Sequence, residues 1–212
     1  MDKHRTTIDT YDRCAQGFAE AFMDNDLYWA SLDRFARELK PHGRLLDLGC
    51  GPGNNARYLL TRLPELRIAG VDLAPAMIEI ARKEVPQGEF WVGDIRHLGP
   101  AGKPWDAILA AFCLPYLNKT EARDFIQNLG GHLTSGGHLY LSCMEGDGSG
   151  YETASFSDGH PIYVRYFAQA EVAAWLEEAG LRVTEIVRQE YPEPDGSITI
   201  DMIFLCTKGG QQ

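Results

Sequence analysis

Residues 45–53 read LLDLGCGPG, an apolar run with an acidic residue near its end that continues into glycines at every second position. Gly49, Gly51 and Gly53 allow the backbone to turn tightly and to lie close to a ligand, because glycine has no side chain to clash. The segment therefore predicts a strand, a ligand-binding turn and the start of a helix, with Asp47 beside the turn.

Two more acidic residues close short apolar runs further along the chain. Asp72 ends the run IAGVD, nineteen residues after Gly53, and Asp94 follows EFWV in the segment GDI. In open α/β sheets, ligands bind beyond the carboxyl ends of the strands, where the strand order reverses. The three carboxylates are therefore expected to meet at one nucleotide-like ligand.

The composition indicates a single globular domain over residues 1–212, with 44% hydrophobic and 24% charged residues. A formal net charge of −10 disfavours binding to a phosphate backbone, so no nucleic-acid partner is expected. Five cysteines without a C-x-x-C pair indicate a cytoplasmic protein. We find no apolar block of signal-peptide or membrane-span type, and we expect no membrane contact and a monomer or homodimer.

Hydrophobic periodicity predicts the fold class. Helical spacing from Ile8 to Phe22 and from Trp29 to Leu39 indicates a helical cap over residues 1–40, and strand-like and helix-like segments alternate from residue 44. Residues 181–191 and 197–208 are strand-like and have no helix between them, so they should pair as a hairpin. The prediction is an α/β core over residues 44–207, with a Rossmann-like sheet of seven mostly parallel strands, helices on both faces and a C-terminal antiparallel hairpin.

From about residue 7 to residue 207 the chain resembles a class I S-adenosylmethionine-dependent methyltransferase, most specifically in the D-x-G-x-G-x-G segment. The resemblance implies S-adenosyl-L-methionine as cofactor, with Asp47 organising its methionine end, Asp72 accepting from the ribose hydroxyls and Asp94 accepting from the adenine amine. The predicted cofactor-binding residues are Tyr11, Asp47, Gly49, Cys50, Gly51, Asn54, Asp72, Leu73, Met77, Asp94, Ile95, Ala110, Ala111 and Phe112.

Two other functions stay open at this point. Gly51, Gly53 and Ala56 also satisfy the G-x-G-x-x-A pattern, and an acid about twenty residues later suits an NAD-dependent oxidoreductase. Asp47 disfavours the oxidoreductase, because a carboxylate repels a pyrophosphate and attracts the ammonium and sulfonium of S-adenosylmethionine. The second alternative is a catalytically silent methyltransferase-like partner subunit.

The acceptor is the least determined feature. Residues 110–117, AAFCLPYL, lack the signatures of nucleobase-amine and arginine methyltransferases and the acids of a metal site. We therefore expect methyl transfer to an oxygen, nitrogen or carbon of a small molecule by in-line displacement, without a metal. Residues 145–171 are expected to form a long loop at the acceptor pocket. His160, as a base that titrates near neutral pH, and Tyr166 are the candidate catalytic residues, although His160 also suits a plain turn before Pro161.

Overall fold

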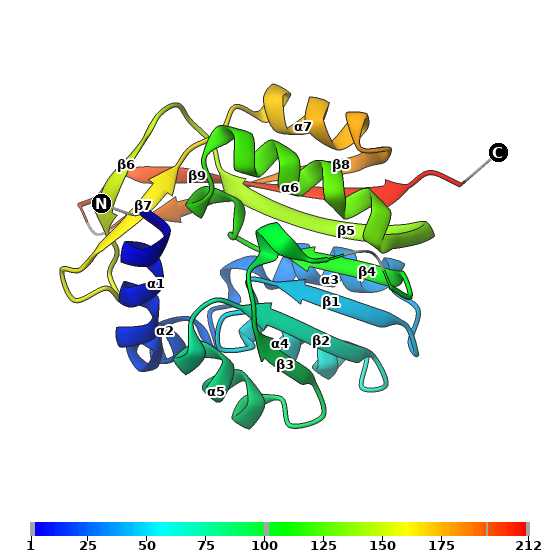
Figure 1. Cartoon of the computed structure of the whole chain (residues 1–212), viewed down its shortest axis with the longest axis horizontal. Coiled ribbons are helices and arrows are strands. Elements are labelled where there is room, and N and C mark those ends of the chain that lie inside the picture. The colour runs from blue at the N-terminus through cyan, green and yellow to red at the C-terminus, as the bar shows by residue number, and fades with distance from the viewer. Residues whose placement is uncertain (1–2, 100–101, 194, 211–212) are drawn as a thin grey trace.

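The computed structural model describes residues 3–99, 102–193 and 195–210. Within them, seven strands form one sheet in the order β3-β2-β1-β4-β5-β9-β8, drawn in Figure 1. The strands are β1 (Arg44–Leu48), β2 (Arg67–Asp72), β3 (Glu89–Val92), β4 (Trp105–Ala110), β5 (Leu133–Met144), β8 (Leu181–Pro192) and β9 (Ile198–Lys208). The first five are mutually parallel, and β9 runs antiparallel to both β5 and β8. The predicted Rossmann-like sheet and its C-terminal hairpin are confirmed.

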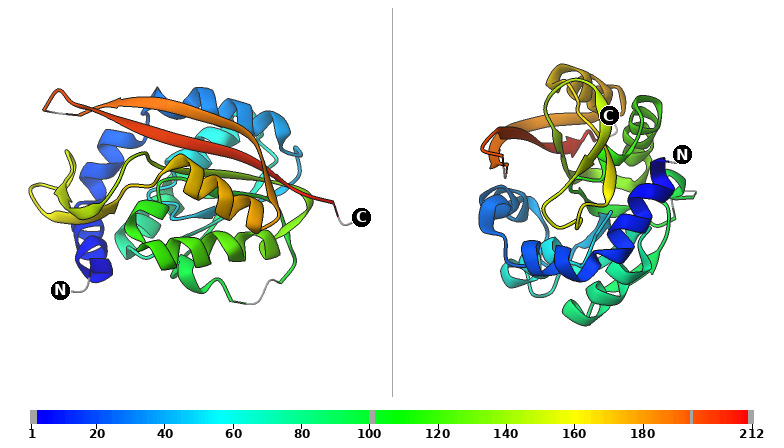
Figure 2. Two further views of the ribbon diagram at one scale, coloured as in Figure 1. Left: turned by 90° about the horizontal axis from the view of Figure 1, so that it is seen from above. Right: turned by 90° about the vertical axis from the view of Figure 1, so that its left-hand side faces the viewer.

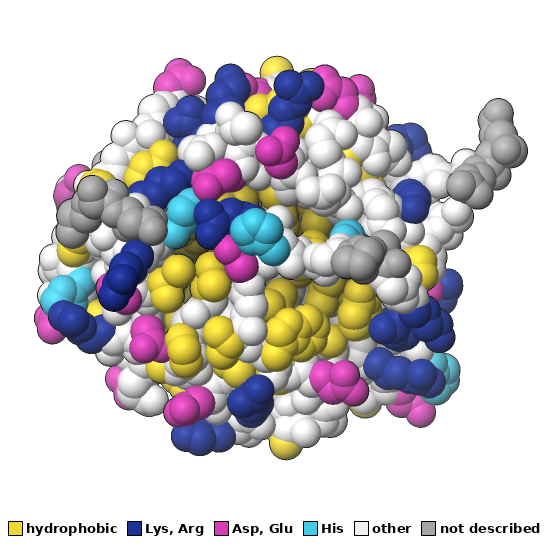
Figure 3. Space-filling model, viewed as in Figure 1, with side chains coloured by type: hydrophobic (Ala, Val, Ile, Leu, Met, Phe, Trp, Pro, Cys, Tyr) yellow, Lys and Arg dark blue, Asp and Glu magenta, His cyan; other side chains and the backbone are white. Residues whose placement is uncertain are grey.

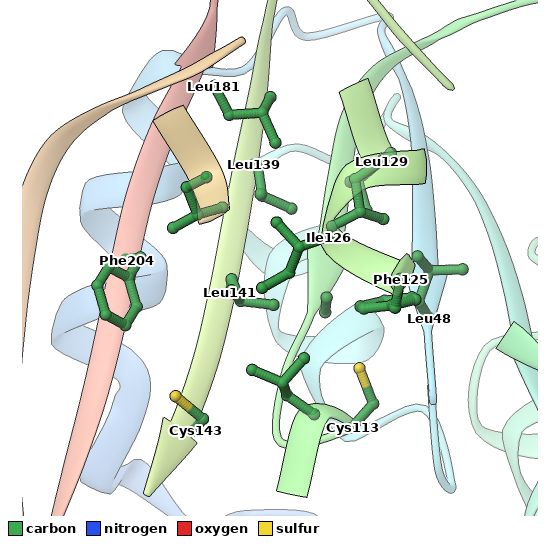
Figure 4. Packing of buried hydrophobic residues seen from close by; sticks show 14 of the residues in the cluster. Leu48, Cys113, Phe125, Ile126, Leu129, Leu139, Leu141, Cys143, Leu181 and Phe204 are labelled. Carbon is green, nitrogen blue, oxygen red and sulfur yellow. The ribbon is translucent and has the colours of Figure 1, made fainter. Parts of the chain in front are cut away.

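Helices cover both faces of this sheet. The helices α6 (Lys119–His132) and α7 (Gln169–Glu178) lie on one face, where Phe125, Ile126 and Leu129 pack against Leu139 and Leu141 of β5 (Figure 4). On the other face lie α3 (Trp29–Glu38), α4 (Asn54–Arg62) and α5 (Pro75–Glu84). Both faces are apolar, as expected for a parallel sheet that is covered on two sides.

Local signals place two of these helices as expected. Asn118 accepts from the backbone amide of Glu121 at 2.9 Å, and the Glu121 side chain accepts from the Asn118 amide at 2.8 Å, which closes the predicted capping box of α6. Pro75 stands in the first turn of α5, where its missing amide hydrogen costs nothing.

The predicted helical cap divides into two parts with different roles. The helix α3 is part of the core, because Leu32 and Phe35 pack against the sheet face that α4 and α5 also cover, and Phe35 contacts Tyr140 of β5. The helices α1 (Lys3–Arg13) and α2 (Ala15–Phe22), which meet at Cys14, instead lie across the carboxyl ends of the parallel strands. The boundaries of a single domain remain a prediction.

The expectation of a plain loop over residues 145–171 was wrong. It contains β6 (Ser149–Thr153) and β7 (Pro161–Arg165), an antiparallel hairpin that lies beside α1 over the same edge of the sheet (Figure 2). Two threonines of α1 complete β7: Thr7 Oγ1 accepts from the Tyr163 amide at 2.9 Å, and Thr10 Oγ1 donates to the Pro161 carbonyl at 2.8 Å. Local periodicity could not reveal the hairpin, because these partners lie about 150 residues away in the chain.

An aromatic cluster joins the N-terminal helices to this hairpin. Tyr11, Phe18 and Phe22 each contact the ring of Phe156, with centroid distances of 5.1, 4.9 and 6.0 Å. We call Tyr11, Phe18, Phe22 and Phe156 the aromatic roof. Aromatic pairs in such tilted and edge-to-face arrangements stabilise beyond their buried area, so the roof holds α1, α2 and the hairpin together.

On the face seen in Figure 3, hydrophobic side chains gather near the middle and charged ones border them. The open edge strand β3 runs across this face and exposes Trp91 by 41% and Val92 by 49%. Within the described ranges, no helix combines the length and the apolar character that a membrane crossing requires.

Two adjacent glycines near the end of α6 provide a test of the packing between α6 and α7. A Cβ on Gly130 would lie 2.5 Å from the Ala179 carbonyl oxygen, whereas a Cβ on Gly131 would meet no atom within 4 Å. We expect Gly130→Ala to lower the free energy of unfolding by about 1–3 kcal/mol through overpacking. Gly131→Ala should raise it by up to about 1 kcal/mol through helix propensity. Urea unfolding followed by circular dichroism measures both, and equal effects of the two variants would contradict the packing described.

Candidate functional site

A cavity of about 350 Å³ lies between the carboxyl ends of the strands and the aromatic roof. Its lining includes residues of α1, the turn after β1, the ends of β2 and β4, the β6–β7 hairpin and the far end of the β8–β9 hairpin. Segments that are distant in the sequence thus meet at the edge where the strand order reverses between β1 and β4.

The turn after β1 has the conformation that its glycines predict. Gly49, Gly51 and Gly53 have φ angles of +68°, +53° and +84°, in the left-handed region that side chains disfavour. A Cβ on Gly49 would lie only 2.8 Å from the Cβ of Cys113. The amides of Gly49 and Cys50 both donate to the Val71 carbonyl, at 2.8 and 3.1 Å, and so bind the turn to the end of β2.

Asp47 is the most unusual group at the site. Its side chain is buried, and neither carboxylate oxygen has a hydrogen-bond partner within the described part of the chain. Burial raises the pKa of Asp47 to about 8, with a further contribution from the nearby charge of Asp72. A buried carboxylate without a partner is costly, and a cation held in the cavity would relieve that cost.

Asp72, at the end of β2, is held by backbone amides. Its Oδ2 accepts from Gly51 and its Oδ1 accepts from Ala74, both at 2.9 Å. Burial raises the pKa of this carboxyl, while the amides of Ala74, Gly51 and Leu73 oppose the rise. Each oxygen keeps a further acceptor site, so the fixed carboxylate is able to bind two neighbouring hydroxyls at once.

Asp94 has a strong partner of its own. The Arg96 guanidinium donates to both of its oxygens, with the Nη2–Oδ2 distance 2.6 Å, and also donates from Nη1 to Glu121 at 3.0 Å. Burial alone would raise the pKa of Asp94, but the hydrogen bonds from Arg96 bring it below its usual value. An adenine amine at Asp94 would therefore share this carboxylate with Arg96 or displace it.

At the end of β4 the backbone is strained. Phe112 is not a glycine but has a φ angle of +53°, and its amide donates to Ser142 Oγ at 3.0 Å. Its ring lies 5.1 Å from that of Tyr28. Non-glycine residues in this region of φ cost free energy and tend to occur at functional sites. Beside it, burial raises the pKa of the Cys113 thiol, which suits a packed residue rather than a nucleophile.

Beyond Phe112, the cavity continues under the β8–β9 hairpin. We call this part the acceptor half, and the part around Gly49, Gly51, Asp72 and Asp94 the cofactor half. In the acceptor half, Tyr28 of the short helix η1 (Asp26–Tyr28) donates its hydroxyl to Asp201 Oδ2 at 2.6 Å. We did not anticipate Asp201, although an acid inside the apolar run of β9 was a usable signal.

The structure brings together most of the predicted cofactor-binding residues. All of them line the cavity except Asp47 and Ala110, which are buried next to it in the chain segments before Gly49 and Ala111. Of the candidate catalytic residues, Tyr166 lines the cavity and donates to Glu152 at 3.1 Å. His160 is not among the lining residues, and its Nε2 lies 3.5 Å from Arg13 Nη1. The individual roles remain predictions.

Sequence comparison relates this site to methyltransferases. Residues 45–137 match the family model of the methyltransferase domain. The trans-aconitate 2-methyltransferase of Methylobacterium nodulans is 31% identical over 160 residues, which cover 70% of this chain and 60% of that enzyme. The chain thus spans less than two thirds of the length of the first curated relatives that it matches.

Two solved structures share the fold over nearly the whole chain. The DhpI–SAH complex has a TM-score of 0.74 at 18% identity and covers 99% of this chain and 98% of its own. A 1,6-didemethyltoxoflavin-N1-methyltransferase from Burkholderia thailandensis, with bound 1,6-didemethyltoxoflavin and S-adenosylhomocysteine, has a TM-score of 0.73 at 18% identity, covering 99% and 91%. The predicted resemblance to class I S-adenosylmethionine-dependent methyltransferases is confirmed.

The unpaired Asp47 carboxylate should make stability depend on pH. Its folded pKa of about 8 lies above the unfolded value of about 3.9, so the folded chain binds this proton more tightly. The contribution of Asp47 to the free energy of unfolding therefore falls as the pH rises from about 4 to about 8. We expect Asp47→Asn to gain stability over the wild type across this window, as measured by urea unfolding at several pH values.

Asp124→Asn is the matched control, because Asp124 is an exposed carboxylate on α6. Its difference from the wild type should stay nearly constant with pH. A constant difference for Asp47→Asn as well would show that Asp47 is not an unrelieved buried charge.

Proposed function

Because the chain carries a methyltransferase domain over residues 45–137 on a class I fold, we propose that it transfers a methyl group from S-adenosylmethionine to a small molecule in the acceptor half. The observation that most strongly supports this proposal is the unpaired Asp47 carboxylate next to the left-handed glycine turn. A cationic ligand at this turn would favour ionisation of the Asp47 carboxyl, whereas an anionic pyrophosphate would oppose it. The charge therefore favours S-adenosylmethionine over NAD.

The residues of the cofactor half fit this ligand. Asp47, ionised beside a bound cation, would offset the charge of the ammonium and the sulfonium, and Asp72 offers two acceptors to a ribose. Gly51 leaves room against the turn, because a Cβ there would meet no atom closer than Phe18 at 3.8 Å, and Met77 and Leu73 supply apolar contacts. The bound cofactor would supply an activated methyl group, so the protein has chiefly to position the acceptor and exclude water.

The cover over the site supports a small acceptor. The aromatic roof and the β6–β7 hairpin lie over the carboxyl ends of the strands, where a polymer would need an open surface. The relatives named trans-aconitate 2-methyltransferase also act on a small molecule by name. His160 and Tyr166 stay candidate catalytic residues, and a cytoplasmic location stays part of the proposal.

Isothermal titration tests the cofactor. We expect S-adenosylmethionine and S-adenosylhomocysteine to bind with micromolar affinity and NAD to bind far more weakly. Asp72→Asn should weaken both by about tenfold or more, because hydrogen bonds to a charged group contribute about 1.5–3 kcal/mol. Glu79→Gln, an exposed position on the neighbouring α5, is the control and should bind like the wild type.

Tight binding of NAD, without binding of S-adenosylmethionine, would contradict the proposal and favour an NAD-dependent oxidoreductase. Cofactor binding without turnover on any acceptor, together with a stable complex with another protein, would instead favour the silent partner subunit.

A further inference from the structure

We propose that the acceptor is an uncharged aromatic or heteroaromatic ring with an exchangeable N–H or O–H, and that Asp201 binds this group and takes its proton. The inference rests on the proposed methyl transfer and assigns the acceptor class and a catalytic residue to the same cavity. It is carried by the charges, the hydrogen bonds and the aromatic walls of the acceptor half.

Asp201 is built into the wall of this half. Its side chain is only 3% exposed, yet it lines the cavity. Oδ2 accepts from the Tyr28 hydroxyl at 2.6 Å, and Oδ1 has no hydrogen-bond partner among the residues that the structure describes. In the sheet Asp201 pairs with Met144 at the carboxyl end of β5, two residues beyond Ser142, which holds the strained Phe112 amide. One oxygen is thus fixed and the other is available near the end of β4.

The surrounding charges exclude an anionic acceptor. Glu193 and Glu152 line this half together with Asp201. In the part of the lining that the structure describes, the basic side chains are His4 and Arg96, and both bind Glu121 near the cofactor half. A carboxylate acceptor would face like charges in a partly buried site without a basic side chain beside it to offset them, which is unfavourable.

The remaining walls suit a ring. The acceptor half is lined by Phe112, Tyr140, Tyr166 and Tyr191, together with Met144 at the end of β5. Tyr140 is nearly fully buried, and its hydroxyl lies 3.0 Å from Ser31 Oγ, so its ring is held in place. Aromatic faces bind flat rings well, while a few convergent polar groups fix their orientation.

These groups account for every bond and proton that changes in the methyl transfer. The acceptor nitrogen or oxygen forms a bond to the methyl carbon, the bond from that carbon to sulfur breaks, and its electron pair stays on the sulfur. The acceptor proton passes to Asp201. Burial raises the pKa of Asp201 to about 6, the Tyr28 hydrogen bond opposes the rise, and Glu193 adds to it. Such a carboxyl is ionised at neutral pH and accepts a proton that becomes acidic as the new bond forms.

Several titratable groups face Asp201 and shape its response to pH. They are Tyr28 of η1, Tyr116 after β4, Tyr140 and Cys143 of β5, Tyr166 after β7, and Tyr191 and Glu193 at the end of β8. Burial raises the pKa of each tyrosine and of Cys143, so these groups stay neutral near pH 7. Glu193 is the charged neighbour.

The family match covers the three carboxylates of the cofactor half but only part of the acceptor half. Tyr28, Tyr191 and Asp201 all lie outside the matched residues 45–137, whereas Asp47, Asp72 and Asp94 lie inside them. The acceptor named for the curated relatives therefore does not follow from the matched domain.

Matched acceptor pairs test the proposal. The wild type, saturated with S-adenosylmethionine, is assayed for S-adenosylhomocysteine release with benzimidazole, hydroxycoumarin, the ring carboxylate of each, and trans-aconitate. Calorimetry with S-adenosylhomocysteine present measures binding of the same probes. We expect the neutral rings to bind and react at least about tenfold better than their carboxylates, and trans-aconitate to be inert.

Variants then test Asp201 itself. Asp201→Asn should lower the rate on the neutral rings by about a hundredfold or more and abolish the acidic limb of the pH profile. Tyr28→Phe removes a hydrogen bond that lowers the pKa of Asp201, so the acidic limb should move to higher pH. Glu190→Gln, an exposed carboxylate on the same hairpin, is the control and should leave rate and profile unchanged.

Preference for trans-aconitate or the ring carboxylates would overturn the proposal, as would the failure of every neutral ring while the cofactor still binds. A lost rate in His160→Asn with full activity in Asp201→Asn would assign the base to His160 and overturn it too. Failure of the protein to bind S-adenosylmethionine at all would instead refute the proposed function.

Discussion

The amides of Gly49 and Cys50 donate to the same carbonyl, that of Val71, and the site depends on this bend. It ends β1 abruptly, turns the chain back over the end of β2 and leaves Asp47 buried without a partner. It also directs the Gly51 amide to Asp72. One turn thus positions two carboxylates, of which one is hydrogen-bonded and the other is not. Asp72 accepts hydrogen bonds from amides, while the ionised form of Asp47 depends on a cation from outside the protein.

The features that were predictable from the sequence are those with local causes. The glycine turn, the capping box at Asn118 and the alternation of strands and helices each arise within a few residues of chain, and the structure has all three. The β6–β7 hairpin and the pairing of Asp94 with Arg96 were missed for different reasons. The hairpin needs Thr7 and Thr10 from the far N-terminus, whereas Arg96 lies two residues from Asp94, and its side-chain direction is set by Glu121 of α6.

The two halves of the cavity are assembled in different ways. The carboxylates of the cofactor half follow three consecutive strands within about fifty residues of chain, so a single domain model captures them. The acceptor half combines Tyr28 before the first strand, Phe112 after β4 and Asp201 in the last strand. A chain is therefore able to keep the first half and alter the second through changes at its two ends, which agrees with a fold that serves many acceptors.

The threonine contacts between α1 and β7 have a consequence for the surface as well as for the cavity. A strand with an open edge is a template for pairing with other chains. Thr7 and Thr10 use their hydroxyls to satisfy the Tyr163 amide and the Pro161 carbonyl, two groups on the edge of β7 that faces away from β6. The N-terminal helix therefore protects this strand edge against pairing with other chains. Removing α1 would expose unpaired backbone groups of β7 beside the cavity and favour aggregation.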